Sequence, residues 1–209
     1  MQVSASFLGS PNIPNLLEEL NVTSVNYIHV DVMDGKYVSH KTMPFREMKK
    51  IAWYTSKRLD VHLMVAKPWK WIKKFATLNT AFIIIHPDIL DDVQDCLDLI
   101  KSYGIKAGIA MRPDVTIEDI EGYLDKIDVL LVMGVEPGAS NQNYIEDTTK
   151  KVNDIKKYLK KVKSNCLISV DGGITNERRK ELKNADILVS ASYISKSEDK
   201  EEAIKSLRG

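Results

Sequence analysis

The chain has few of the features that mark secreted or membrane-bound proteins. Its 209 residues include only two cysteines, Cys96 and Cys166, and neither belongs to a Cys-x-x-Cys pair. We therefore expect core thiols in a reducing compartment rather than a disulfide framework. No run approaches the ~20 apolar residues that a membrane span needs, and the N-terminus has no signal-peptide pattern. We predict a cytoplasmic protein that does not contact a membrane.

An excess of charge of one sign is also missing. Thirty Lys and Arg residues stand against 29 Asp and Glu residues, which gives a net charge of +1. This balance argues against nucleic acid or an anionic membrane as a partner, because both require a basic surface. Trp69 and Trp71 leave two interpretations open: packing of their helix against the rest of the protein, or an anchor in a homo-oligomer interface.

Short β-rich runs alternate with amphipathic helical patterns along the whole chain, as in proteins built from strand–helix units. Eight runs are expected as strands: 3–8, 26–32, 58–65, 81–86, 106–111, 128–133, 166–170 and 186–190. A helix is expected after each: 14–20, 44–54, 68–78, 89–103, 117–124, 143–162, 176–182 and 199–207. This pattern favours an α/β fold, a single-domain (β/α)8 TIM barrel over residues 1–209, rather than a doubly wound sheet or a solenoid.

Histidines and aspartates gather at the ends of the predicted strands, where a barrel of this kind builds its active site. His29 and Asp31 are two residues apart, so their side chains lie on one face of the second strand. His62 lies near the end of the third strand, and Asp171 directly follows the seventh. Two buried carboxylates would repel each other without a cation between them. We therefore predict that these four residues bind one divalent metal ion, Zn²⁺, Fe²⁺ or Mn²⁺.

Four runs around these residues form a recognisable set. They are His-Val-Asp-Val-Met-Asp-Gly at 29–35, Asp-Val-His-Leu-Met-Val at 60–65, Val-Glu-Pro-Gly at 135–138 and Val-Asp-Gly-Gly-Ile at 170–174. In order and spacing they resemble the signatures of the ribulose-phosphate 3-epimerase family, and the resemblance runs nearly end to end. The Asp-x-Lys-x-x-Asp run of decarboxylases and synthases with related barrels is absent from this sequence.

The resemblance implies a metal-dependent isomerase of carbohydrate metabolism, which inverts C3 of D-ribulose 5-phosphate to give D-xylulose 5-phosphate in the pentose phosphate pathway. Asp31 and Asp171 would be the acid/base pair, one removing the C3 proton to leave an enediolate and the other returning a proton to the opposite face. The resemblance also implies a set of substrate-binding residues. They are Ser6, His62, Met33, Met64 and Met133, together with Gly138, Ala139, Ser140, Asn141, Gly172, Gly173, Ala191 and Ser192 in the loops expected to hold the phosphate.

Departures from the family's pattern gather in the loops. Gly-Phe-Gly-Gly-Gln after strand six reads Gly-Ala-Ser-Asn-Gln at 138–142, and Gly-Ser after strand eight reads Ala-Ser at 191–192. His-x-Glu after strand four reads His-Pro-Asp at 86–88. Alanine and serine still offer backbone N–H groups, but they resist the left-handed conformations open to glycine. Arg112, where the family has Asn, is either a substrate contact or a rim residue in a surface salt bridge.

These departures keep the identity of the substrate open. One alternative is a sister 3-epimerase acting on a six-carbon ketose phosphate, such as allulose 6-phosphate, or on another ketose. A second alternative is a barrel that binds a sugar phosphate but turns it over weakly or not at all. Exchange of the C3 hydrogen with solvent, tested on both sugars, distinguishes the three.

Overall fold

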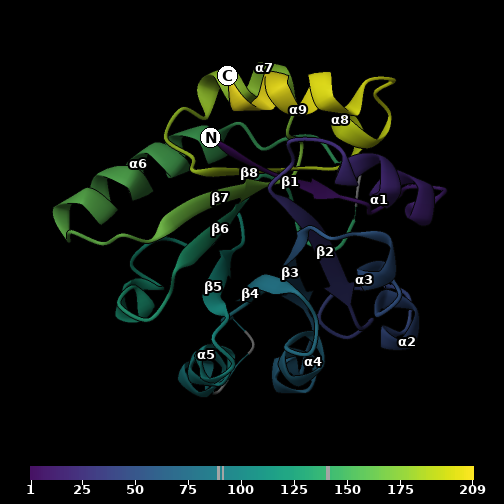
Figure 1. Ribbon diagram of the computed structural model, residues 1–209. Helices are drawn as coiled ribbons and strands as arrows, with labels where there is room; N and C mark the ends of the chain where they lie inside the picture. Colours follow the sequence, from purple (N-terminus) through teal and green to yellow (C-terminus); the bar gives the residue numbers. More distant parts are fainter. Residues whose placement is uncertain (89, 91, 140–141) are drawn as a thin grey trace.

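Eight parallel strands form a closed barrel in the computed structural model, which describes residues 1–88, 90, 92–139 and 142–209. Each strand pairs with the next along the chain, and the last pairs with the first. Figure 1 looks along the axis of this ring. The strands are Gln2–Ser6 (β1), Tyr27–Met33 (β2), Arg58–Met64 (β3), Thr80–Ile85 (β4), Lys106–Met111 (β5), Val129–Met133 (β6), Leu167–Asp171 (β7) and Ile187–Ser190 (β8). The predicted (β/α)8 barrel is confirmed.

Helices surround the ring, and several begin at a polar side chain that caps them. Side-chain oxygens of Asn12, Asp92, Thr175 and Asp199 each accept a hydrogen bond from a backbone N–H of the following first turn. Such caps satisfy donors that have no partner inside the helix. The helices are Ile13–Asn21 (α1), Phe45–Met48 (α2), Ile51–Tyr54 (α3), Pro68–Phe75 (α4), Val93–Ser102 (α5), Asp147–Lys161 (α6), Asn176–Glu181 (α7), Ser192–Ser195 (α8) and Lys200–Arg208 (α9).

The prediction of an α-helix after the fifth strand is wrong. Where a helix over 117–124 was expected, only a 3-10 turn forms, Glu121–Tyr123 (η1). Gly122 disfavours a helix by about 1 kcal/mol relative to alanine. Ile120 and Leu124 are nevertheless buried, which accounts for the helix-like spacing of apolar residues. The helix expected over 44–54 is divided into α2 and α3, and α8 was not predicted.

The barrel interior is apolar on one side and polar on the other. Buried aliphatic side chains of β6 and β8, among them Leu131 and Val189, pack together inside the ring. Tyr27 and Phe82 meet edge to face, with ring centroids 5.2 Å apart. The buried polar residues inside the ring come mainly from β1, β2 and β3, with one from β7 and one just after β4: Ser4, Ser6, His29, Asp31, Asp60, His62, Ser169 and His86. The fold therefore concentrates polar groups beside the first three strands.

Both cysteines are free and buried, as the sequence predicts. Burial, together with the nearby Asp128 and Asp186 carboxylates, raises the pKa of the Cys166 thiol to about 12. Because the thiolate is the reactive form, this cysteine is inert at neutral pH.

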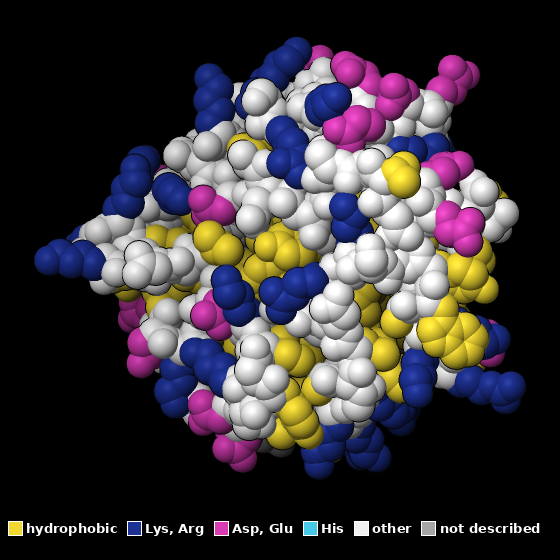
Figure 2. Space-filling view, viewed as in Figure 1, with side chains coloured by type: hydrophobic (Ala, Val, Ile, Leu, Met, Phe, Trp, Pro, Cys, Tyr) yellow, Lys and Arg dark blue, Asp and Glu magenta, His cyan; other side chains and the backbone are white. Residues whose placement is uncertain are grey.

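Charges of both signs share the surface. Lys and Arg side chains are interspersed with Asp and Glu side chains around the rim of the face in Figure 2, in keeping with the small net charge. Trp71 packs against the hydrophobic core beside Phe75, whereas Trp69 is 41% exposed. The packing interpretation therefore holds for Trp71, and a homo-oligomer stays a prediction. In the described part of the chain, no helix has both the length and the apolar character that a membrane crossing requires.

Candidate metal centre and active site

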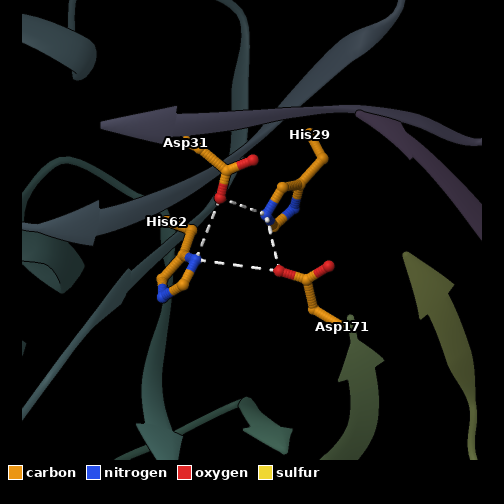
Figure 3. Close-up of side chains that lie close together, drawn as sticks. All are labelled: His29, Asp31, His62 and Asp171. Atoms are coloured by element: carbon orange, nitrogen blue, oxygen red, sulfur yellow. Dashed lines mark hydrogen bonds and ion pairs between the residues drawn. The ribbon is translucent and has the colours of Figure 1, made fainter. Parts of the chain in front are cut away.

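The four predicted metal ligands meet at the carboxyl ends of β2, β3 and β7 (Figure 3). One side-chain atom from each lies within 4.8 Å of the other three. Oδ1 of Asp31 is 3.3 Å from His29 Nε2 and 3.2 Å from His62 Nδ1. Oδ2 of Asp171 is 3.6 Å from His29 Nε2 and 4.0 Å from His62 Nδ1. Two carboxylate oxygens therefore alternate with two imidazole nitrogens around one point.

The environment of His29 shows that this cluster fits a cation. The ring is fully buried, and among the described residues its Nε2 has no hydrogen-bond partner. A buried polar atom without a partner is costly. An imidazole nitrogen beside carboxylates is, however, an ordinary donor set for Zn²⁺, Fe²⁺ or Mn²⁺. The residues fit a divalent metal ion, and their mixed nitrogen and oxygen set does not select among the three.

Asp60 fixes the direction in which His29 presents Nε2. Its Oδ2 lies 2.9 Å from His29 Nδ1 and accepts a hydrogen bond of 2.8 Å from Ser4 Oγ. When Nδ1–H donates to this carboxylate, Nε2 carries the lone pair that faces the cluster. No role was predicted for Asp60 from the sequence, although it lies two residues before His62 on the same face of β3.

The two aspartates of the cluster titrate very differently. Burial, reinforced by Asp31 and only partly opposed by His29, raises the pKa of Asp171 to about 6. Asp31 is buried as well, but the His29 and His62 imidazoles outweigh burial and hold its pKa well below the usual range. Carboxyls whose environments separate their pKa values in this way are suited to act as a proton donor and a proton acceptor.

A cavity of about 470 Å³ opens above the cluster, with Asp31 and Asp171 in its wall. His29 and His62 are fully buried. Ser140 and Asn141, predicted to bind substrate, lie outside the described residues. The other predicted substrate-binding residues that line the cavity are Ser6, Met33, Met64, Met133, Gly138, Ala139, Gly172, Gly173, Ala191 and Ser192.

Two basic side chains in the cavity wall were not predicted from the sequence: Arg178 on α7 and Lys196 just after α8. Arg178 is paired with Glu146 and with Glu181, the latter at 3.2 Å. Lys196 is exposed. The loops after β7 and β8, which were expected to hold a phosphate, are therefore accompanied by positive charge.

The loops that follow β2 and β6 meet at the mouth of the barrel. Gly138 has a φ of 111°, and a Cβ at this position would lie 2.8 Å from Cβ of Val38. Both the backbone conformation and the close approach therefore require glycine. Arg112 lies on the rim, 3.2 Å from Glu136 and 3.6 Å from Asp114. Its observed contacts are those of a rim residue in surface salt bridges.

Replacing Asp60 with asparagine is expected to lower Zn²⁺ affinity by about 10- to 100-fold, because an outer carboxylate orients the ligating imidazole and strengthens it as a donor. Competition with a chromophoric chelator measures this change. Asp128→Asn is the matched control, since Asp128 accepts a hydrogen bond from the Ala107 N–H at the amino end of β5. Equal affinities for the Asp60→Asn variant and the parent would show that Asp60 does not support the metal ion.

Comparison with known protein families gives a match over nearly the whole chain. The model described as the ribulose-phosphate 3 epimerase family matches residues 3–195. Ribulose-phosphate 3-epimerase of Helicobacter pylori strain J99 is 36% identical over 211 residues, covering 100% of this chain and 97% of the relative. The enzyme of the same name from Bacillus subtilis is 31% identical, covering 93% and 91%. Ribulose-5-phosphate-3-epimerase, chloroplastic, of Arabidopsis thaliana is 33% identical, covering 99% and 75%.

Solved structures with lower sequence identity share the barrel. KGPDC from Streptococcus mutans superposes with a TM-score of 0.72 at 12% identity, covering 99% of this chain and 95% of that one. The 3-hexulose-6-phosphate synthase from Salmonella typhimurium gives a TM-score of 0.68 at 16% identity, covering 99% and 96%. At these identities the likeness supports the fold alone.

Proposed function

The chain belongs to the ribulose-phosphate 3-epimerase family and is an isomerase acting on carbohydrates, and from this premise we propose a metal-dependent inversion of C3 in D-ribulose 5-phosphate. The observation that carries the proposal is the position of Asp31 and Asp171. They occupy opposite corners of the cluster in Figure 3 and reach one cavity from strands that are not neighbours in the barrel. Two carboxyls placed in this way can act on the two faces of one carbon.

Each aspartate has one oxygen turned toward the imidazoles and a second oxygen available for proton transfer. Oδ1 of Asp31 and Oδ2 of Asp171 face His29 and His62. The second oxygen of Asp31, Oδ2, accepts a hydrogen bond of 3.1 Å from Ser6 Oγ. Ser6 thus fixes the rotation of this carboxylate about its own bond, which is what a positioned base needs.

These two aspartates account for both proton transfers of the reaction. The ionised carboxylate takes the C3 proton, which is acidic because C3 lies beside the C2 carbonyl, and an enediolate remains. The carboxyl on the other side, already protonated, gives its proton to the opposite face of C3. The centre is inverted, one aspartate has gained a proton and the other has lost one. Each such positioned group contributes roughly 10²- to 10⁴-fold to the rate.

His29, Asp31, His62 and Asp171 would hold the divalent metal ion. A metal ion there supplies Lewis-acid stabilisation of the negative charge that builds up on the substrate oxygens, several kcal/mol in typical sites. The chain itself limits water around the reacting carbon. Three methionine side chains line the cavity, and Gly138 packs against Val38 at its mouth. Reduced access of water strengthens the electrostatic interactions inside the site.

Lys196 is proposed to attract the substrate phosphate, together with backbone N–H groups of residues 172–173 and 191–192. Lys196→Ala is expected to raise KM for ribulose 5-phosphate by about tenfold, the loss of one hydrogen bond to a charged group, with kcat little changed. Steady-state kinetics at low ionic strength measure both constants. Lys183→Ala, a substitution just beyond α7, is the matched control. An unchanged KM for Lys196→Ala would remove this residue from the phosphate site.

The proposed reaction is tested by following the C3 hydrogen of ribulose 5-phosphate in D₂O with the metal-loaded protein. We expect deuterium at C3 and formation of xylulose 5-phosphate. Exchange with allulose 6-phosphate but not with ribulose 5-phosphate would assign the chain to the six-carbon alternative, which the altered loops at 138–142 and 191–192 keep open. Binding of metal and sugar phosphate without exchange on either sugar would make the chain a binding protein instead.

A further inference from the structure

His62 contacts a second buried histidine outside the metal cluster. Its Nε2 lies 2.8 Å from Nε2 of His86, which follows β4. The ring centroids are 5.0 Å apart, so the two nitrogens are the nearest parts of the rings and face each other. Both residues are almost completely buried, at 0% and 3% exposure. One of these nitrogens must therefore donate a proton to the other, since two facing lone pairs in a buried site would repel each other.

The direction of this hydrogen bond decides whether His62 can bind a metal ion. Nδ1 of His62 faces Asp31 and Asp171, so it must carry a lone pair to act as a ligand. The proton of a neutral His62 ring is then on Nε2 and is donated to His86. In the opposite tautomer, Nδ1–H donates to Asp31 Oδ1 at 3.2 Å, and no lone pair faces the cluster.

The surroundings of His86 favour the first arrangement. If Nε2 of His86 accepts, its proton lies on Nδ1, which is 3.8 Å from Oδ1 of the Asp88 carboxylate and is attracted by its negative charge. Among the described residues, His86 Nδ1 makes no hydrogen bond, and the carboxylate that faces it is that of Asp88.

Asp88 is itself held in place. The Tyr37 hydroxyl donates to both of its oxygens, at 3.1 and 3.2 Å, and Arg112 Nη1 lies 3.8 Å from Oδ2. The Tyr37 ring also covers His86, with ring centroids 4.8 Å apart. The contact with Asp88 gives the rim residue Arg112 a structural role. It helps to keep a carboxylate beside His86, at the position where the family pattern has a glutamate one methylene longer.

We propose that His86, oriented by Asp88, is a positioning residue that selects the tautomer of His62 in which Nδ1 presents its lone pair to the metal ion. The inference rests on the proposed function, because it requires a metal ion at the cluster. Each ligating imidazole then has its own supporting residue: Asp60 contacts Nδ1 of His29, and His86 contacts Nε2 of His62. Both ligating imidazoles are then fixed by a hydrogen bond from their other ring nitrogen.

Nitrogen NMR of the Zn²⁺-loaded, isotope-labelled protein tests this directly. We expect His62 to be protonated at Nε2, His86 to be protonated at Nδ1, and a through-hydrogen-bond coupling to join the two Nε2 nuclei. A proton on Nε2 of His86 would overturn the proposal while leaving metal binding intact. Failure to bind Zn²⁺ at all would overturn the proposed metal site as well, so the two failures are distinguishable.

Zn²⁺ affinity of variants provides a second readout that does not depend on activity. His86→Leu removes the acceptor and is expected to weaken Zn²⁺ binding by about 10- to 100-fold. His86→Gln, whose amide oxygen can accept from Nε2–H of His62, is expected to restore most of the affinity. His40→Leu is the matched control, since His40 is exposed and lies in the loop after β2. Equal Zn²⁺ affinities for His86→Leu and the parent would contradict the proposal.

Discussion

Replacing Asp171 with asparagine is expected to lower kcat for C3 epimerisation by more than about 10⁴-fold, beyond the loss of a single positioned acid or base. The amide nearly preserves the shape of the side chain, but it neither gives nor takes a proton at neutral pH. The same substitution removes one anionic ligand from the cluster, where Oδ2 lies 3.6 Å from His29 Nε2. The reaction therefore loses a proton carrier and part of its metal site in one step.

The measurement is kcat at saturating ribulose 5-phosphate with the metal ion in excess, so that weaker metal binding does not limit the rate. Asp186→Asn is the control: Asp186 directly precedes β8, at the opposite end of the barrel, and its carboxylate binds Lys156 and the Ile168 N–H. This control is expected to keep kcat within a few-fold of the parent. If Asp171→Asn kept a tenth of the parent activity, Asp171 could not be one of the two proton carriers.

Removal of the metal ion is expected to abolish exchange at C3 to a similar extent. Loss of several kcal/mol of charge stabilisation corresponds to at least about a thousandfold in rate. Without the ion, Asp31 and Asp171 are also left facing each other in a buried site, which disfavours having both ionised. Dialysis against a chelator, elemental analysis and an exchange assay on the same sample measure the effect.

Restoration provides the control for that experiment. Adding back Zn²⁺, Fe²⁺ or Mn²⁺ is expected to recover exchange, because the cluster of two nitrogens and two oxygens accepts all three. Addition of the ion should also raise the unfolding temperature, since a ligand that binds only the folded chain stabilises it. Undiminished exchange by protein shown to be metal-free would mean that the four residues act without an ion.

Most of the barrel was predictable because each strand carries its own signal. β5 has the predicted bounds, Lys106–Met111, and each end of the other strands lies within two residues of its predicted position. The helix pattern was less reliable where apolar spacing and backbone preference disagree. Residues 117–124 have the spacing of a helix, but Gly122 and the hydrogen bond from the Thr116 N–H to the Asp119 side chain favour turns.

The metal cluster was predictable because it depends on two simple rules. Side chains two residues apart lie on the same face of a strand, which places His29 beside Asp31. The carboxyl ends of all parallel strands lie at the same end of the barrel, which brings His62 and Asp171 to them. The contacts around the cluster depend on the stagger between strands, which the sequence does not state. The approach of His86 to His62 and of Asp60 to His29 became evident only from the structure.

Charges in the cavity wall were harder to foresee than those at strand ends. Arg178 lies in a helix whose sequence, Asn-Glu-Arg-Arg-Lys-Glu, is ordinary for a solvated surface. Lys196 follows a four-residue helix that no sequence pattern indicated. Their place beside the cavity follows from the start of α7 and α8 within a few residues of the ends of β7 and β8, and it depends on the packing of the whole ring.

The most direct test of a four-residue metal site acting with two aspartates is proton NMR of ribulose 5-phosphate in D₂O during titration of Zn²⁺ into metal-free protein. We predict that deuterium enters at C3 alone, at a rate that rises until one equivalent of Zn²⁺ is bound and then levels off. Exchange at C3 that is independent of Zn²⁺, or deuterium that enters at C1 instead, would contradict this mechanism.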